Sequence, residues 1–426
     1  MQVVITGLGL VTPAGLTLED NWRKIIGGEV TVKRMMSGEV SFLVKLGSGI
    51  ENFDPKRYIK NRKNLRFLRR DVQYCLASAE LACEDGKLDL STIDPSRVGL
   101  YVGSGEPQME YDSFFSSLDY SLDGDGHLDY KKFGSLGLQH IYPPFVLLDL
   151  FNNGFCYLSI ERGITGMNNN FTMGASSGHA IGEAFKAIQR GDVDIAIAGG
   201  HDSLSSCFEN CFLYSATGLL THEEDPLKAM KPYSASRDGF VPGEGAGFII
   251  FENLKHALHR NAPIRGEIVG YSCNCDTNGD LLDPDPNGEG LSHAMGAALR
   301  DAKIDPWQVD YINSEGNATL KNDLSETRAF KKVFGKKAYD IPISTVKPVI
   351  GHLGAASSAV ELIITTLALE RGIAPPTINY IGGDPECDLD YVPHNYRAKE
   401  MQYAVSVNKG LGGQNCVFVL KKHPSL

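Results

Sequence analysis

A turn of small residues that begins at Gly174 is the part of this sequence closest in pattern to an active site. An apolar strand leads into the turn, and an amphipathic helix follows it, with apolar residues at Ala184, Ala187 and Ile188. Such a turn exposes one side chain at the positive end of the helix, where backbone N–H groups stabilise a thiolate or an oxyanion. That residue is Gly174. The sequence therefore predicts the frame of a nucleophilic site without a nucleophile.

Other side chains near the turn are poor replacements for the missing nucleophile. Ser176 and Ser177 come after the apex, and no base is recognisable near them in the sequence. Serine at a helix start usually caps the helix, so we predict that role for both. Cys156 lies in an apolar stretch and is predicted to be an unreactive core residue.

The composition limits the classes of function that fit this chain. Its 426 residues suffice for one large domain or two medium ones, and 52 acidic against 41 basic residues argue against a nucleic-acid-binding surface. The chain starts with a strand-like segment rather than a signal peptide, and no apolar run approaches the ~20 residues that span a bilayer. We expect a soluble, cytoplasmic protein that binds neither nucleic acid nor membrane.

The cysteines do not form a metal site in the sequence. Their odd number, nine, and their scattered positions predict reduced thiols. The pairs Cys273/Cys275 and Cys207/Cys211 lack the spacing and partners of a zinc site. We therefore expect no bound metal.

Short β-branched runs alternate with helical stretches, which predicts an α/β protein with buried strands. After residue 255 the pattern restarts, and a second turn of small residues at 351–356 leads into a helix as the first one does. These observations predict an N-terminal half, residues 1–255, and a C-terminal half, residues 256–426. The irregular segment 103–150 is predicted to be an insertion that caps the pocket or faces a partner.

Blocks spread over nearly the whole chain resemble the β-ketoacyl-acyl-carrier-protein synthases. The turn at Gly174 resembles their nucleophile elbow, which reads Thr-Ala-Cys-Ala-Ser. The other blocks are Val3–Gly9 with Thr12 and Pro13, Arg237–Gly247 and Val407–Asn415. The resemblance implies the thiolase fold, a five-layered α-β-α-β-α sandwich of two halves related by a pseudo-twofold axis. It also implies chains carried on the phosphopantetheine of an acyl carrier protein, with no cofactor bound to the protein itself.

The second of the two histidines that the family uses in catalysis is retained. Residues 347–352 match the family pattern Lys-x-x-x-Gly-His, and Lys347 and Glu361 match its buried lysine–glutamate pair. Taken alone, His352 would be interpreted as a buried structural histidine, but within this block the resemblance assigns it to the site. A buried pair of this kind orients other groups, because removing one partner leaves an unpaired charge.

The first of those histidines is replaced. The family pattern Asn-Ala-His-Gly-Thr-x-Thr corresponds to residues 313–319, where Glu315 stands in place of the imidazole. An ionised carboxylate would repel a forming enolate, so it cannot perform the histidine's task. Glu315 is either protonated in a dry pocket or paired with His352 or Lys347, and we favour pairing over acid–base catalysis.

Further departures fall in the acyl and pantetheine pocket implied by the resemblance. Asn317 replaces one of two threonines expected to hold the pantetheine, and Thr319 matches the other. The family's final loop, Phe-Gly-Phe-Gly-Gly-Thr-Asn, corresponds to Lys-Gly-Leu-Gly-Gly-Gln-Asn at 409–415, so a cation enters at Lys409 and Leu411 replaces the gating phenylalanine. The residues assigned to this pocket are Asn317, Thr319, Phe240, Lys409 and Leu411.

A basic run stands out in this acidic chain. A run of this kind is either a solvated helix face or a docking surface, and it falls where related synthases dock their acidic carrier protein. Opposite charge would steer such a partner toward the site. The candidate docking residues are Lys60, Arg62, Lys63, Arg66, Arg69 and Arg70.

An intact fold without a nucleophile resembles the chain-length factor, or ketosynthase-β subunit, of type II polyketide synthases. The resemblance implies a non-condensing subunit that pairs with a catalytic ketosynthase in a heterodimer and shapes the tunnel for an aromatic or polyene chain. Such subunits often carry glutamine at the elbow, whereas Gly174 has no amide to offer an enolate. We expect the dimer contact at the strand 194–198. Candidates to limit chain length are Tyr111, Phe114, Phe115 and Tyr120.

Other functions stay open at this point. One alternative is a non-condensing enzyme that uses Glu315 and His352 to decarboxylate a malonyl carrier protein or to hydrolyse a thioester. Another is a homodimeric scaffold that only binds acyl carrier protein.

Overall fold

The computed structural model describes residues 1–35, 44–106, 111–277 and 281–424. Its centre is a ten-stranded mixed sheet with the strand order β10-β9-β13-β14-β8-β1-β7-β6-β4-β5. The strands of one half are β1 (Val3–Val11), β4 (Val98–Ser104), β5 (Asn168–Thr172), β6 (Ile195–Ser203) and β7 (Glu244–Asn253). Those of the other half are β8 (Gly266–Cys275), β9 (Tyr311–Asn313), β10 (Ile343–Ser344), β13 (Tyr403–Gly410) and β14 (Gln414–Lys421). Two small separate ladders pair β2 (Lys33–Arg34) with β3 (Leu46–Gly47) and β11 (Ile373–Ala374) with β12 (Arg397–Ala398).

The two halves of the sheet repeat one topology and meet along a short seam. Outward from the seam the order is β1-β7-β6-β4-β5 on one side and β8-β14-β13-β9-β10 on the other. At the seam, Val3, Val4 and Ile5 of β1 pair with β8. Each half can therefore follow its own twist while the sheet remains one hydrogen-bonded unit.

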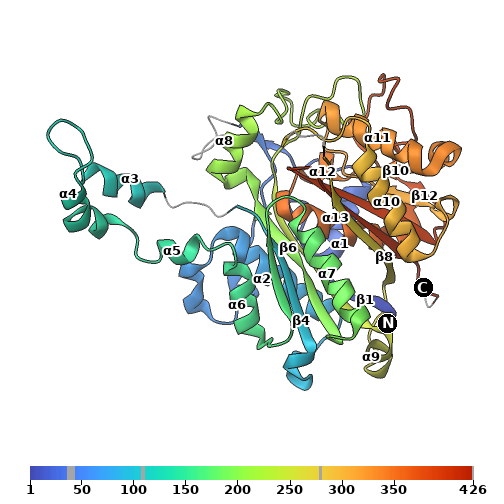
Figure 1. Ribbon diagram of the computed structural model, residues 1–426, viewed down its shortest axis with the longest axis horizontal. Coiled ribbons are helices and arrows are strands. Elements are labelled where there is room, and N and C mark those ends of the chain that lie inside the picture. Colours follow the sequence, from blue (N-terminus) through green and yellow to red (C-terminus); the bar gives the residue numbers. More distant parts are fainter. Residues whose placement is uncertain (36–43, 107–110, 278–280, 425–426) are drawn as a thin grey trace.

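Helices cover the half-sheets in layers (Figure 1). Helices α7 (Ser176–Arg190) and α13 (Ser357–Arg371) form the middle layer, with α2 (Arg70–Asp85) and α6 (Asn153–Arg162) on one outer face and α10 (Glu289–Ala302) and α11 (Leu320–Phe334) on the other. Alternation along β6 shows how the sequence builds these layers. Its Ile195 and Ile197 join the outer core with α2, whereas Ala196 and Ala198 join the central core with α7 and α13. The predicted five-layered thiolase fold is confirmed.

Shorter helices complete the chain. They are α1 (Leu18–Ile26), α3 (Tyr111–Asp119), α4 (Tyr130–Ser135), α5 (Phe145–Leu148), α8 (Phe208–Ala216), α9 (Leu254–His259) and α12 (Lys347–Ile350). In the described part of the chain, no helix combines the length and the apolar character needed to cross a membrane.

Residues 111–150, which we call the arm, do not lie where one of the two predictions for the insertion placed them, over the pocket. The arm carries α3, α4 and α5 and projects away from the layered body (Figure 1). It does not cap the pocket of its own chain, and none of the four predicted chain-length aromatics, all within the described residues, lines that pocket. Residues 107–110 of the predicted insertion lie outside the described residues. The arm is attached at its base, where the Arg69 guanidinium donates to the Leu148 carbonyl oxygen.

The strand expected to form the dimer contact is also corrected. Residues 195–198 belong to β6, which lies between β7 and β4 and pairs with both. Its backbone groups are already used in the sheet, so no further strand can add there. Among the described strands, the free edge of this half is β5, which pairs with β4 and has exposed or half-buried residues throughout.

Candidate functional site

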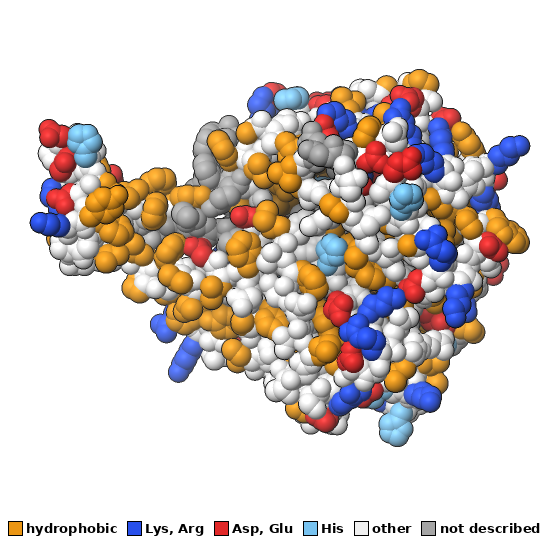
Figure 2. All heavy atoms as spheres, viewed as in Figure 1, with side chains coloured by type: hydrophobic (Ala, Val, Ile, Leu, Met, Phe, Trp, Pro, Cys, Tyr) orange, Lys and Arg blue, Asp and Glu red, His pale blue; other side chains and the backbone are white. Residues whose placement is uncertain are grey.

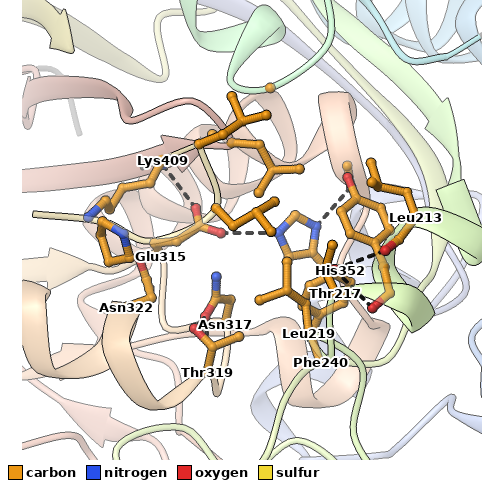
Figure 3. Close-up of a pocket in the computed structure, with 18 of the residues that line it drawn as sticks. Leu213, Thr217, Leu219, Phe240, Glu315, Asn317, Thr319, Asn322, His352 and Lys409 are labelled. Atoms are coloured by element: carbon orange, nitrogen blue, oxygen red, sulfur yellow. Dashed lines mark hydrogen bonds and ion pairs between the residues drawn. The ribbon is translucent and has the colours of Figure 1, made fainter. Parts of the chain in front are cut away.

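A cavity of about 550 Å³ lies where the ends of several strands meet the loops that follow them. It is lined by Met173 and Gly174 of the elbow (residues 173–175), by Glu315, by His352, and by the turn between β13 and β14. Figure 3 shows the side chains of Glu315 and His352 directed toward one another inside it. The topology thus brings together the residues assigned to the site from the sequence.

The elbow has the predicted strand–turn–helix form. Met173 and Gly174 both adopt left-handed backbone conformations, with φ of 59° and 55°, between β5 and α7. The predicted serine caps are wrong, because Ala175 holds the N-cap position and its side chain makes no capping hydrogen bond. Ser176 and Ser177 are buried, and Ser177 Oγ accepts a hydrogen bond from the Ala359 N–H at 3.2 Å.

The space beside Gly174 is occupied by another side chain, that of Gln414. A Cβ atom built on Gly174 would lie 2.4 Å from Gln414 Oε1. The same oxygen accepts a hydrogen bond from the Ala175 N–H at 3.1 Å. Sequence reasoning missed this residue, and the only signal was the glutamine at position 414, where the family loop reads threonine. An amide is therefore present at the elbow, contrary to expectation.

Both ring nitrogens of His352 are engaged. Its Nδ1 accepts a hydrogen bond from the Gly354 N–H at 3.0 Å, so the proton of the neutral ring lies on Nε2. Nε2 is 3.2 Å from Glu315 Oε1 and donates to it. Burial lowers the pKa of His352 despite the nearby carboxylate, which favours the neutral ring. The one N–H of this neutral imidazole is thus already bound within the protein.

Glu315 is held ionised by its neighbours. Burial alone would raise its pKa, but the Lys347 charge and the hydrogen bond from His352 outweigh burial and lower the pKa to about 2. Lys347 Nζ lies 3.2 Å from Glu315 Oε1, and the Lys409 N–H donates to Glu315 Oε2 at 3.2 Å. The predicted pairing of Glu315 with His352 and Lys347 agrees with this geometry, and a protonated Glu315 does not.

The predicted pair of Lys347 and Glu361 is also present. Lys347 is buried, forms an ion pair with Glu361, and donates a hydrogen bond to the Glu315 carbonyl oxygen at 2.6 Å. The neighbouring carboxylates raise the pKa of Lys347 against the effect of its burial. A single cation thus serves two buried glutamates, one of them in the position of the missing histidine.

Comparison with known proteins identifies the family. The model described as "Beta-ketoacyl synthase, N-terminal domain" matches residues 1–257, and "Beta-ketoacyl synthase, C-terminal domain" matches residues 265–381. The chain belongs to the β-ketoacyl synthase family.

Relatives and solved structures agree with this family over the full chain. Proteins named 3-oxoacyl-[acyl-carrier-protein] synthase 2 from Synechocystis sp. and Coxiella burnetii are 34% and 35% identical, and each match covers 99% of this chain and 98% of the relative. The ishigamide ketosynthase/chain length factor is 26% identical with a TM-score of 0.86, and a β-ketoacyl synthase from Burkholderia phymatum is 27% identical with a TM-score of 0.86. A structure described as a type II PKS acyl-carrier protein in complex with its ketosynthase bound to the hexaketide is 29% identical with a TM-score of 0.84. Each of these three structural matches covers 99% of both chains.

The residues assigned to the pantetheine side of the pocket do line the cavity. Asn317 Oδ1 accepts hydrogen bonds from the Thr319 N–H at 3.0 Å and from its hydroxyl at 2.8 Å. The hydroxyl proton of Thr319 is thereby used within the protein. Phe240 and Leu411 also line the cavity, and the Phe240 ring centroid lies 4.8 Å from that of His352.

Lys409 enters the cavity wall as a buried cation. Its Nζ lies 3.5 Å from Ser325 Oγ and 3.9 Å from Asp276 Oδ2, and burial lowers its pKa. Another ionisable group, Asp202, was missed by the sequence analysis. It lines the cavity, accepts hydrogen bonds from the Ser203 and Ala355 N–H groups at 2.7 and 2.8 Å, and burial raises its pKa to about 7.

The basic run divides into exposed and internal residues. The Arg69 guanidinium is buried and makes two 3.1 Å hydrogen bonds to Asp71, so its assignment to docking is wrong. Arg70 is partly exposed but forms a 3.3 Å ion pair with the buried Glu244. The exposed members of the run are Lys60, Arg62, Lys63, Arg66 and Arg70, of which Arg70 is tied to Glu244.

The remaining cysteine and metal expectations concern residues away from the cavity. Cys156 is half-buried on α6 rather than in the core, and burial raises the pKa of its thiol. Among the described residues, the one group of metal-ligating side chains close enough to share an ion is Asp123, Asp125 and His127, all exposed on the arm.

Proposed function

We propose that this chain is a non-condensing member of its family, a chain-length-factor-like subunit that pairs with a catalytic ketosynthase. The observation that carries the proposal is the state of the site: Gly174 has no side chain to accept an acyl group, and the N–H of the neutral His352 is bound to an ionised Glu315. Condensation requires a nucleophile and a donor to the developing oxyanion. The 34–35% identical relatives named as synthases establish the family, and these two positions argue against their reaction in this chain.

The same geometry disfavours the alternative in which Glu315 and His352 perform acid–base chemistry. An acid must hold a proton near neutral pH, whereas the Glu315 pKa is lowered to about 2. A carboxylate bound by Lys347, His352 and the Lys409 N–H has its oxygens already occupied. Incubation with a malonyl carrier protein tests this: we expect no decarboxylation, and turnover that disappears in Glu315→Gln would favour the enzyme.

Pairing is supported by the arm and by the edge of the sheet. Hydrophobic side chains gather along the arm and its junction with the body (Figure 2). Contiguous exposed apolar surface of this kind usually marks a protein–protein contact. Close to the arm in sequence, β5 is an edge strand of the sheet formed by the described residues. The exposed large hydrophobic residues of the arm are Phe115, Tyr120, Leu122, Leu128, Tyr130, Leu136, Leu138, Tyr142, Val146, Leu147 and Leu150.

The aromatic residues that we predicted to limit chain length lie on the arm and not in the cavity of this chain. On the arm, the Phe115 ring stacks on that of Tyr111 and meets that of Phe114 edge-on, and none of the three lines the cavity. Any influence of these side chains on a growing polyketide would therefore act across the interface, in or near the partner's tunnel. Which polyketide is made, aromatic or polyene, is a property of the assembled pair.

Co-expression with candidate catalytic ketosynthases tests the proposed function. We expect a heterodimer in size-exclusion chromatography, and intact mass measurement after exposure to an acylated carrier protein should find the acyl group on the partner only. A homodimer that persists beside every candidate partner would favour the scaffold alternative. An acyl adduct on this chain would refute the non-condensing assignment.

A further inference from the structure

The space at the elbow is filled by a side chain from a distant part of the sequence, that of Gln414. Gln414 Oε1 lies 2.4 Å from the place where a Cβ on Gly174 would stand, and Gln414 Cδ lies 3.1 Å from it. Two non-bonded heavy atoms do not approach to 2.4 Å, so a larger residue at 174 requires the flexible end of the Gln414 side chain to leave this position. The carboxamide oxygen therefore occupies the volume that a nucleophilic side chain would need.

The same oxygen also accepts a hydrogen bond from a backbone N–H of the elbow, that of Ala175. The Ala175 N–H lies at the start of α7, where a helix leaves its N–H groups without intrahelical partners. It donates to Gln414 Oε1 at 3.1 Å. Gln414, from the last hairpin, thus caps α7. The N-cap residue, Ala175, has no side chain that could do so. An oxyanion could bind this N–H only after displacing the amide.

The hairpin that carries Gln414 is built to hold this position. Gly410 pairs with Gln414 across the β13–β14 turn, and a Cβ on Gly410 would lie 2.5 Å from the Ala175 nitrogen. Only a residue without a side chain lets the hairpin pack this closely on the elbow. On the far side of Gln414, Asn415 Nδ2 donates to Asp276 Oδ1 at 2.8 Å and anchors the strand.

We propose that Gln414 is a built-in plug of the elbow and that Gly174 and Gln414 form one interdependent device. Gly174 makes room for the amide, and the amide fills the volume and satisfies the N–H that the missing nucleophile leaves. Gln414 is a positioning residue: its amide fills the elbow and holds the Ala175 N–H, and it touches no reacting atom. The inference rests on and deepens the proposed non-condensing function, since a plugged elbow accepts neither an acyl group nor an oxyanion.

A double-mutant cycle of Gly174→Cys and Gln414→Ala tests the plug. The left-handed backbone at 174 strains the new side chain equally with and without the glutamine, so the cycle isolates the contact with Gln414. Each variant is unfolded thermally and alkylated with iodoacetamide, and the rate at the introduced thiol is followed by peptide mass mapping. The exposed native Cys273 serves as the internal rate standard, because Cys275 pairs directly with Gln414.

We expect Gly174→Cys alone to melt below the wild type. Its introduced thiol should react at least about 10-fold more slowly than the same thiol in the double variant, since one lost contact of about 1.4 kcal/mol is a factor of ten. Addition of Gln414→Ala should raise the rate and recover part of the melting temperature, because the strain of the left-handed backbone at 174 remains. Equal rates and equal melting temperatures with and without Gln414 would overturn the plug.

Gln414→Ala in the otherwise unchanged chain keeps the inference testable if the cysteine variant does not fold. Amide hydrogen exchange in a peptide covering residues 173–180 should be about 10-fold faster, because Ala175 loses its hydrogen-bond acceptor. Gln402→Ala is the control, since Gln402 is exposed and its side-chain amide donates to the Lys422 carbonyl oxygen, far from the elbow in the sheet. Unchanged exchange would contradict the plug. The failure of the proposed function would instead appear as an acyl adduct on the wild-type chain, which this experiment does not measure.

Discussion

The cavity and the arm differ in how their side chains are satisfied. In the cavity, the Nε2–H of His352 binds Glu315, the Thr319 hydroxyl donates to Asn317, and the Ala175 N–H binds Gln414. On the arm, large apolar side chains remain in solvent: Tyr130 is 80% exposed and Val146 is 62% exposed. Polar groups that would contact a substrate have internal partners, whereas apolar groups that would contact a protein stay uncovered.

This difference fits the proposed function, in which the chain contributes by contact with a partner rather than by chemistry. Internal hydrogen bonds at the site make it costly for a substrate to gain partners there, because each exchange breaks a bond that already exists. Exposed apolar surface has the opposite property, since its burial by a partner is favourable. The variants below test each side of this comparison.

The cavity side depends most on Lys347. Replacement by methionine leaves Glu315 and Glu361 buried without their shared cation, so we expect a loss of about 3–5 kcal/mol in the free energy of unfolding. Urea denaturation measures it. Lys332→Met is the matched control, because its ion pair with Glu289 is exposed and should contribute less than about 1 kcal/mol. Equal losses in the two variants would show that the buried network contributes nothing special.

The arm side is tested by placing charges on its apolar surface. Phe115→Asp combined with Val146→Asp should weaken binding to the partner ketosynthase by about 30-fold or more, because buried aromatic and aliphatic contacts dominate interface energies. Calorimetry or analytical ultracentrifugation measures the dissociation constant. Leu258→Asp is the control, since Leu258 is 58% exposed on α9, outside the arm. An unchanged dissociation constant in the arm variant would remove the arm from the interface.

The ionised state of Glu315 predicts an acid limb in the stability profile. Its pKa is lowered from 4.5 to about 2 in the folded protein, so it contributes stability above pH 4.5 that is lost as the pH falls toward 2. The full contribution is on the order of 3 kcal/mol. Asp202, with a pKa raised to about 7, acts in the opposite direction and lowers stability as the pH rises from its ordinary value of 3.8 toward 7.

Urea unfolding between about pH 2 and pH 8 measures both limbs. We expect Glu315→Gln to flatten the limb below pH 4.5. The slope above pH 4.5 should become shallower but persist, because the Glu315 charge helps to raise the pKa of the buried Glu361 and Glu326, whereas Asp202 is still present. An acid limb of equal steepness in Glu315→Gln would mean that Glu315 is not the ionised group at the site.

The smallest effect concerns the exposed cations that were assigned to carrier docking. Lys63→Glu with Arg66→Glu should slow association with an acyl carrier protein by about 5–10-fold at low salt and less at high salt, because such residues act by steering. Stopped-flow measurement of the association rate tests it, with Lys255→Glu on α9 as the control for net charge. Equal slowing in both variants would show that only net charge matters.

Much of the fold and part of the site could be predicted from the sequence. Short β-branched runs such as residues 194–198 predicted buried strands alternating with helices, and residues 195–198 of this run lie in the fully buried β6. Glu315 was expected to pair with Lys347 or His352, since a carboxylate in that block needs a cation or a donor nearby. Motifs within short segments carried these predictions.

Errors arose where burial or strand order decides the outcome. Arg69 belongs to the same basic run as Arg66, yet it is buried against Asp71 while Arg66 is exposed, because the chain turns into α2 at this point. A run of charges does not encode which members face solvent. Likewise, the pattern of β6 resembles that of any buried strand, and only the sheet order shows that β5 is the free edge of the described half-sheet.

The family and the loss of its nucleophile both follow from the amino-acid sequence alone. The layered fold was implied by the resemblance of several motifs to the family, and the loss is read from the residue at 174. What fills the place of the nucleophile depends on three-dimensional packing. Ala175 and Gln414 are 239 residues apart in the chain, and the fit of the glutamine amide into the elbow requires the last hairpin to pack against α7. Packing also leaves the apolar residues of the arm in solvent, because the arm projects away from the body whose described elements could have covered them.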